Sequence, residues 1–185
     1  IDAAHEVAAT LLRRLAVAAP SGVRTFAEEL HTVATDLRHG WSAFGRPFPK
    51  RLLGRALTAA EAEHSDRNTL VNTDLHYGNI LRATREPWLA IDPKVVTGEL
   101  EYGTAQLLWS RFEEMGGAPG FRRRFSALVA AAGLDAQRVH LWALVRILDY
   151  WLWALGQGFT EAPGRCRQLI EWLIEHERQL TARST

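Results

Sequence analysis

A polar segment between apolar residues, VNTDLHYGNIL at positions 71–81, constrains this chain more than any other feature. Within six residues it places a carboxylate at Asp74, an imidazole at His76 and a carboxamide at Asn79. The flanking residues favour β-strands, so the polar residues are predicted to form a loop at a strand end. Such a loop has the groups needed to accept a proton and to bind a metal ion.

A second carboxylate, Asp92, follows at the end of the apolar run 88–91. The short polar stretch 82–87 before that run predicts a hairpin connection. Pro93 disfavours helix at the preceding residue and ends the strand there. The hairpin is therefore expected to bring Asp92 back to the loop. We interpret the two acids and the amide as a place to hold Mg²⁺ and to orient a nucleophile.

The spacing of these residues suits phosphoryl transfer, which depends on positioning and charge neutralisation. In kinase catalytic loops an Asp accepts the proton of the attacking hydroxyl, an Asn five residues later helps to hold metal, and a further Asp follows. Asp74, Asn79 and Asp92 occupy these positions. Asn72 and Thr73 stand where protein kinases have His and Arg, so the protein-kinase form is not matched.

The chain resembles the aminoglycoside-type small-molecule phosphotransferases, whose pattern is HGDLHxGN(I/V)L followed by IDPK. It looks most like the streptomycin and viomycin phosphotransferase branch. Three segments carry this resemblance: VNTDLHY at 71–77, WLAIDPK at 88–94 and EYGTAQLLW at 101–109. Asn72 and Thr73 replace the common His-Gly of the family, and Gly103 stands where many relatives have Asp.

The resemblance implies a mainly α fold with a short β-hairpin, the C-terminal lobe of a protein-kinase-like α+β fold. Residues 1–185 are expected to form a single helical catalytic and substrate lobe without the N-terminal nucleotide lobe. Kinases carry a Gly-rich loop and a strand Lys in that lobe, whereas Lys50 here lies in a Pro-flanked loop. We therefore expect this stretch alone to be inactive.

The implied full-length enzyme transfers the γ-phosphoryl group of ATP to a hydroxyl of a small cationic antibiotic, streptomycin-like or viomycin-like, and confers resistance. By resemblance, Asp74 is the catalytic base, and Asn79 and Asp92 bind Mg²⁺. Lys94 is a candidate phosphate contact. Four residues are candidates for binding the acceptor: His76, Glu99, Glu101 and Asp149.

Lys94 and Asp149 also have purely structural interpretations. Lys94 has Glu99 and Glu101 nearby as surface ion-pair partners. Asp149 follows Arg146 by three residues on one face of a predicted helix, where the two can form a buried ion pair.

Two residues of the loop and the single cysteine also have structural interpretations. His76 can steady the loop through hydrogen bonds, and Gly78 is predicted to supply a backbone angle that other residues avoid. Cys166 has no His or acidic context that would make it a nucleophile, so we interpret it as a small apolar residue.

Hydrophobic periodicity predicts a largely helical chain. The predicted helices cover 3–18, 25–42, 51–64, 101–115, 121–132, 135–155 and 161–182, with a strand at 70–71 and a loop at 95–100. The helix over 135–155 is nearly continuous in apolar residues. Its three polar members, His140, Arg146 and Asp149, argue against a transmembrane segment because charge is costly in a bilayer.

Composition limits the partners, the compartment and the number of domains that we expect for this protein. The formal net charge is +1, without the basic character that marks nucleic-acid binding, so we expect no nucleic-acid and no membrane partner. One cysteine excludes an intrachain disulfide and fits a reducing compartment, which predicts a cytoplasmic protein. With 47% hydrophobic residues and seven Trp, 185 residues can bury the core of one domain.

Two other functions stay open on the sequence alone. One is a helical lobe that binds a ligand or a partner without catalysis. The other is a metal-dependent hydrolase that uses Asp74, His76 and Asp92 and turns over without nucleotide.

Overall fold

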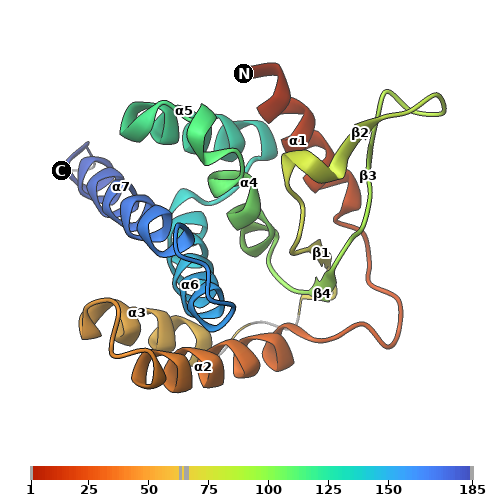
Figure 1. The fold of residues 1–185 in the computed structure, drawn as a ribbon. Coiled ribbons are helices and arrows are strands. Elements are labelled where there is room, and N and C mark those ends of the chain that lie inside the picture. The colour runs from red at the N-terminus through yellow and green to blue at the C-terminus, as the bar shows by residue number, and fades with distance from the viewer. Residues whose placement is uncertain (1, 63, 65–66, 184–185) are drawn as a thin grey trace. The chain divides into compact units, whose positions relative to one another are not determined.

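The computed structural model describes residues 2–62, 64 and 67–183, and this part of the chain is mainly helical (Figure 1). The α-helices are α1 (Asp2–Leu15), α2 (Phe26–Ala43), α3 (Lys50–Glu61), α4 (Ala105–Trp109), α5 (Gly117–Ala132), α6 (Ala136–Gly156) and α7 (Ala162–Arg183). The regular β-structure in the described ranges consists of short antiparallel strands. The predicted class, mainly α with a short β-hairpin, is confirmed.

In the described part of the chain, four strands form two antiparallel pairs. In the predicted hairpin, β2 (Ile80–Arg82) pairs with β3 (Trp88–Ala90), which confirms that prediction. In the second pair, β1 (Leu70–Asn72) pairs with β4 (Val95–Thr97). The prediction of a loop over 95–100 is therefore wrong at its start, because Val96 lies opposite Val71 in this pair and both side chains are buried.

The chain divides into two compact units, which we call unit 1 (residues 1–26 and 65–139) and unit 2 (residues 27–64 and 140–185). Unit 1 contains strands β1 to β4, and in it α1 packs against α5. Its fully buried large side chains include Leu12, Leu75, Tyr102, Leu107, Leu108, Phe121, Phe125 and Leu128. The residues of the predicted loop and hairpin thus all belong to unit 1.

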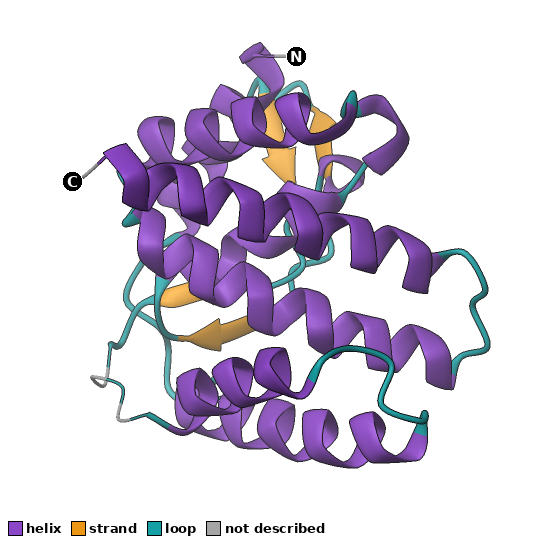
Figure 2. Cartoon of the chain, turned by 90° about the vertical axis from the view of Figure 1, so that its left-hand side faces the viewer, coloured by secondary structure: helices purple, strands orange, loops and turns teal. Residues whose placement is uncertain are grey.

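Unit 2 is built from helices α2, α3 and α7 with most of α6. Helices α6 and α7 lie side by side (Figures 1 and 2), with His140 Nε2 only 3.1 Å from His176 Nδ1. Gly40 of α2 allows close packing, since a Cβ there would come within 3.1 Å of Leu152. The buried side chains of this unit include Leu30, Leu37, Ala56, Trp142, Leu144, Ile147, Leu148 and Leu169.

The single helix predicted over 101–115 is wrong. The structure has a 3-10 helix, η2 (Leu100–Thr104), then α4, then a second short 3-10 helix, η3 (Phe112–Glu114). Ser110 is extended, and Arg111 adopts a left-handed conformation with φ of 53°, so the α-helix cannot continue through them. Helix α5 begins at Gly117, before the predicted start at 121, because Pro119 is tolerated in a first helical turn.

The predicted helix boundary at Asp135 is confirmed. Its Oδ1 accepts hydrogen bonds from the backbone N–H groups of Gln137 (2.8 Å) and Arg138 (2.9 Å), the pattern of an N-cap. Gly133 ends α5 in the left-handed conformation with φ of 65°. None of the described helices, α6 included, combines the length and the hydrophobicity needed to cross a membrane.

Candidate active site

The loop after β1 is anchored by the two residues that replace the family's His-Gly. Thr73 donates to the carbonyl oxygen of Lys94 through its backbone N–H (2.7 Å) and its Oγ1 (3.1 Å). Asn72 is buried, and its Oδ1 accepts a hydrogen bond from the backbone N–H of Asp74 at 3.0 Å. Asn72 and Thr73 themselves therefore support the loop.

Gly103 is also explained by this packing. A Cβ at this position would lie 2.9 Å from the carbonyl oxygen of Asn72 and 2.9 Å from Val71 Cγ1. Both distances are shorter than real Cβ contacts, so the Asp of many relatives does not fit against this arrangement of β1. The absent side chain allows η2 to approach the base of the loop.

Both carboxylate oxygens of Asp74 have partners, and its side chain is only 15% exposed. Lys94 Nζ lies 2.7 Å from Oδ2, and Gln106 Nε2 donates to Oδ1 at 3.0 Å. The carboxylate is thus held in one orientation by a cation and a neutral donor. Gln106 was not predicted as a site residue, although it lies within the EYGTAQLLW segment that supported the resemblance.

Asn79 connects the loop to the hairpin. Its Nδ2 donates to the backbone oxygen of Asp74 (3.2 Å), and its own backbone oxygen accepts from the N–H of Ile91 (2.9 Å). Asp92 follows directly, exposed and in a left-handed conformation with φ of 47°. The hairpin therefore returns the chain to the loop immediately before Asp92, as predicted.

Asn79 and Asp92 provide donors of the kind that Mg²⁺ prefers. Because the amide nitrogen of Asn79 is used within the loop, its carbonyl oxygen is the atom left for a cation. One or two protein oxygen ligands are typical for Mg²⁺, which takes its other ligands from substrate phosphates and water. Among the described residues, no group of three His, Cys, Asp or Glu side chains gathers as a metal site. The residues thus fit a nucleotide-dependent Mg²⁺ site, and their metal-binding role stays a prediction.

His76 takes part in the shape of the loop. It is the N-cap of the 3-10 helix η1 (Tyr77–Asn79), and its Nδ1 accepts a hydrogen bond from the backbone N–H of Gly78 at 3.1 Å. The prediction for Gly78 is wrong, because its φ is not positive. Space explains the glycine instead, since a Cβ there would lie 3.0 Å from the ring of His76.

The two glutamates after β4 are held within unit 1. Glu99 is buried, and Arg138 binds it in a bidentate manner, with Nε 2.8 Å from Oε2 and Nη2 2.5 Å from Oε1. Glu101 accepts the backbone N–H of Asp135 at 3.3 Å. Their predicted contacts with an acceptor stay predictions, and Lys94 has Asp74 as its ion-pair partner here.

Asp149 belongs to unit 2, separate from the loop residues in this division of the chain. Burial raises the pKa of its carboxyl to about 6, which Arg146 opposes and the acidic groups of Asp36 and Glu29 reinforce. The ion pair of Arg146 is with Glu29, at 3.8 Å. Asp149 is therefore a half-buried acid whose desolvation favours its neutral form.

Cys166 matches its prediction as a small apolar residue. It is 2% exposed, and burial raises the pKa of its thiol to about 12. Since only the thiolate is nucleophilic, this side chain is inert at neutral pH.

A kinase-like loop with a paired aspartate, followed by a hairpin and a second aspartate on a mainly helical chain, is the arrangement of the kinase-like phosphotransferases. Residues 2–158 match the family described as Aminoglycoside/hydroxyurea antibiotic resistance kinase, and the chain belongs to this family. No solved structure matches the chain.

Three curated relatives share 36% identity with the chain. A streptomycin 6-kinase of Streptomyces glaucescens aligns over 95% of this chain and 59% of its own length, and one of Streptomyces griseus over 86% and 54%. A hydroxyurea phosphotransferase of Kitasatospora aureofaciens aligns over 93% and 50%. The chain thus spans between half and three fifths of the length of these relatives.

Proposed function

We propose that this chain carries the catalytic loop of an ATP-dependent phosphotransferase that phosphorylates a hydroxyl group of a small cationic antibiotic. The observation that carries the proposal is Asp74, held between Lys94 and Gln106 at the predicted base position of a chain from this family. Two relatives named streptomycin 6-kinase favour a streptomycin-like acceptor over a viomycin-like one.

In the proposed reaction, Asp74 accepts the proton of the acceptor hydroxyl as its oxygen attacks the γ-phosphorus of ATP. The bond from that phosphorus to the bridging oxygen of ADP breaks, and ADP leaves with the electron pair. Gln106 fixes the carboxylate by donating to Oδ1. Lys94, whose side chain is 70% exposed, would exchange its contact with Asp74 for one with a phosphate.

A bound Mg²⁺ would supply charge neutralisation for the phosphates. Asn79 would contribute its amide carbonyl oxygen and Asp92 its exposed carboxylate. We assign the remaining contacts of the nucleotide to an N-terminal kinase lobe of the full-length protein, and the reaction to the cytoplasm.

A second acceptor class has equal support from the comparisons. The relative named hydroxyurea phosphotransferase is as similar to this chain as the streptomycin kinases are. Hydroxyurea is small and uncharged, so an enzyme acting on it needs no acidic residues to hold a cation. Glu101 and Asp149 distinguish the two acceptors, because their replacement should weaken the binding of a cation but not that of hydroxyurea. Replacement of Glu99 would also break its ion pair with Arg138.

The test uses the full-length protein with ATP, Mg²⁺ and, separately, streptomycin, viomycin or hydroxyurea. Mass spectrometry should find one added phosphoryl group on one of these compounds, and Asp92→Ala should raise the Mg²⁺ concentration for half-maximal rate more than Asn79→Ala. Turnover of a compound without any nucleotide would indicate the metal-dependent hydrolase instead. Absence of turnover with all three, in protein that binds ATP, would contradict the proposal and favour a binding lobe without catalysis.

A further inference from the structure

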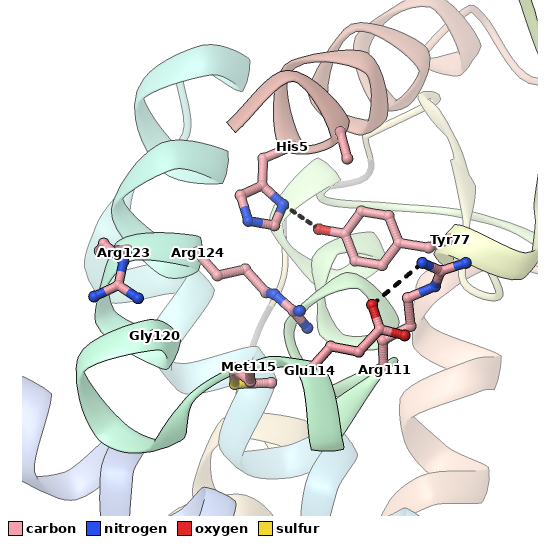
Figure 3. Close-up of a pocket in the computed structure, with 9 residues that line it drawn as sticks. His5, Tyr77, Arg111, Glu114, Met115, Gly120, Arg123 and Arg124 are labelled. Carbon is pink, nitrogen blue, oxygen red and sulfur yellow. Dashed lines mark hydrogen bonds and ion pairs between the residues drawn. The ribbon is translucent and has the colours of Figure 1, made fainter. Parts of the chain in front are cut away.

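A cavity of about 220 Å³ lies beside the loop, entirely within unit 1 (Figure 3). Helix α1, the loop residue Tyr77, the segment around η3 and the first turns of α5 form its walls. Its polar side chains are those of His5, Tyr77, Arg111, Glu114, Arg123 and Arg124. Since liquid water occupies about 30 Å³ per molecule, a small organic molecule fits in this space.

Arg124 is the central feature of the cavity. It is 5% exposed, and its Nη1 donates to the backbone oxygens of Ser110 (2.5 Å), Leu107 (3.4 Å) and Leu108 (3.4 Å). Its guanidinium carbon lies 5.3 Å from the centroid of the Tyr77 ring. Its buried Nε has no hydrogen-bond partner among the described residues. The cation is thus surrounded by neutral carbonyls and an aromatic face, and its buried Nε is unused.

A buried cation without an anion is costly, because water has been replaced by weaker partners. Burial accordingly lowers the pKa of Arg124, while Tyr77 and Glu114 act in the opposite direction. An anion in the adjoining cavity would offset this cost. It would also provide an acceptor for the unused Nε.

The rest of the lining has the same positive character. Arg111 and Arg123 join Arg124, and the one carboxylate, that of Glu114, is engaged with Arg111 at 3.3 Å. Three guanidinium groups against one carboxylate leave a charge of +2 on the lining, with the histidine neutral. Gly120 places the N-terminal end of α5 against the cavity, where the helix dipole also favours an anion.

Tyr77 connects this cavity to the loop. Its hydroxyl lies 2.6 Å from His5 Nδ1 (Figure 3), and burial raises its pKa to about 12, so it stays a neutral hydroxyl. The residue lies between His76 and Gly78 in the segment that carries Asp74 and Asn79. A ligand in the cavity would therefore contact the loop from a residue that the proposed reaction does not use.

We propose that this cavity is a binding site for a small oxyanion, a phosphate or carboxylate group held by Arg124, Arg123 and Arg111 beside Tyr77. Guanidinium groups are suited to both because their N–H fork matches the spacing of the oxyanion oxygens. The inference goes beyond the proposed phosphotransferase reaction and does not depend on it, since it concerns a ligand that is not the transferred group.

The test is isothermal titration calorimetry of the purified protein with sodium phosphate and, separately, sodium malonate. Sodium chloride at equal ionic strength is the reference for general salt effects. Arg111→Ala and Arg123→Ala should each raise the dissociation constant roughly tenfold, the loss expected for one charge-assisted contact. Arg13→Ala removes an exposed arginine of unit 1 that does not line the cavity, and it should change the constant less than about twofold.

Lys94→Ala distinguishes this cavity from the phosphate position proposed near Asp74, and it should leave binding unchanged. Saturable binding of either anion that only Arg111→Ala and Arg123→Ala weaken supports the site. Comparison of the phosphate and malonate titrations shows which anion it prefers. Absence of saturable binding overturns it. So does equal weakening by Arg13→Ala, or loss of binding in Lys94→Ala. Circular dichroism of each variant confirms that the protein is folded.

Discussion

The two units of this chain treat buried charge differently. In unit 1, Glu99 is paired in a bidentate manner with Arg138, and Asp74 is paired with Lys94. In unit 2, burial acts against the charged forms: it raises the pKa of Asp149 to about 6 and lowers that of His140 to about 4. Oppositely charged partners thus hold Glu99 and Asp74 in unit 1. In unit 2, burial favours the neutral forms of Asp149 and His140, although Glu29 of that unit pairs with Arg146.

This difference predicts that the two units respond differently to substitutions and to pH. Charges in unit 1 depend on specific partners, so substitutions there should have large effects on activity or folding at neutral pH. Asp149 and His140 of unit 2 depend on their protonation state, so their effects should appear as changes of stability with pH. Four predictions test this contrast.

The largest effect is expected from the loop itself. In the full-length enzyme, Asp74→Asn should lower kcat by about 10²–10⁴, the usual contribution of a positioned proton acceptor. Asn keeps an oxygen for Gln106 but has a far weaker affinity for a proton. Glu86→Gln is the matched control, since it makes the same acid-to-amide change at an exposed ion pair of unit 1. Coupled measurement of ADP release would contradict the assignment if both variants retained the wild-type rate.

The second prediction concerns the buried ion pair. Arg138→Met should lower the free energy of unfolding by about 3 kcal/mol, because it leaves a buried carboxylate without its partner. The Glu99 side chain is 8% exposed and that of Arg138 36% exposed, which places the expected loss at the lower end for buried pairs. Urea denaturation followed by circular dichroism measures this change.

Arg55→Met is the control in unit 2, where Arg55 and Glu177 form a pair that is 43% and 38% exposed. It should cost at most about 1 kcal/mol, as surface pairs do. Equal losses in the two variants would show that burial does not distinguish these pairs.

Much of the site could be predicted from the sequence because its signals are local. The spacing of Asp74 and Asn79, the hairpin before Asp92 and the cap at Asp135 each depend on a few neighbouring residues. The structure confirms the hairpin and the cap, and it places the loop against the end of β3. The roles in proton transfer and metal binding stay predictions.

The features that sequence reasoning missed depend on contacts between distant residues. Gln106 reaches Asp74 across 32 positions, and Glu99 meets Arg138 across 39. Strand β4 pairs with β1, where Val96 lies opposite Val71, 25 positions earlier in the chain. No Gly or Pro in the sequence marks the helix break at Arg111, and its left-handed backbone is set by tertiary structure.

The third prediction tests protonation in unit 2. His140 is buried against His176, with the two ring centroids 5.2 Å apart. Burial first, then His176, lowers the pKa of His140 from 6.5 to about 4. The unfolded chain therefore binds more protons between these pH values, and the free energy of unfolding should fall as pH decreases through this window. At about 1.4 kcal/mol per pH unit, the contribution is about 3 kcal/mol.

His140→Gln should remove this contribution. Any cost of the substitution itself that is the same at every pH drops out of the comparison. Beyond that cost, the free energy of unfolding of the variant minus that of the wild type should rise by about 3 kcal/mol from pH 7 to pH 4. His39→Gln, at an exposed histidine of the same unit, is the control and should leave the pH profile unchanged. Parallel profiles for His140→Gln and the wild type would contradict the prediction.

The smallest effect is expected at Asp149, and its sign is opposite. Burial raises the pKa of this carboxyl from 3.8 to about 6, so the folded chain binds more protons between these values. Its contribution to stability is complete below pH 4 and is lost as pH rises through 6. Asp149 and His140 therefore partly cancel in the wild type, and only the variants reveal each slope.

Asp149→Asn should accordingly raise the free energy of unfolding at pH 7 by about 1–3 kcal/mol, because an amide has no charge to desolvate. The stability gain should disappear below pH 4, where the wild-type carboxyl is already neutral. Denaturation at pH 4 and pH 7 measures both values.

If Asp149 also binds a cationic acceptor, the same variant should raise KM for streptomycin without lowering kcat, since it removes a binding contact and not a step of the reaction. The opposite outcome in the denaturation experiment is a stability difference, variant minus wild type, that is lower at pH 7 than at pH 4. It would show that Asp149 is held as a paired carboxylate, as Glu99 and Asp74 of unit 1 are.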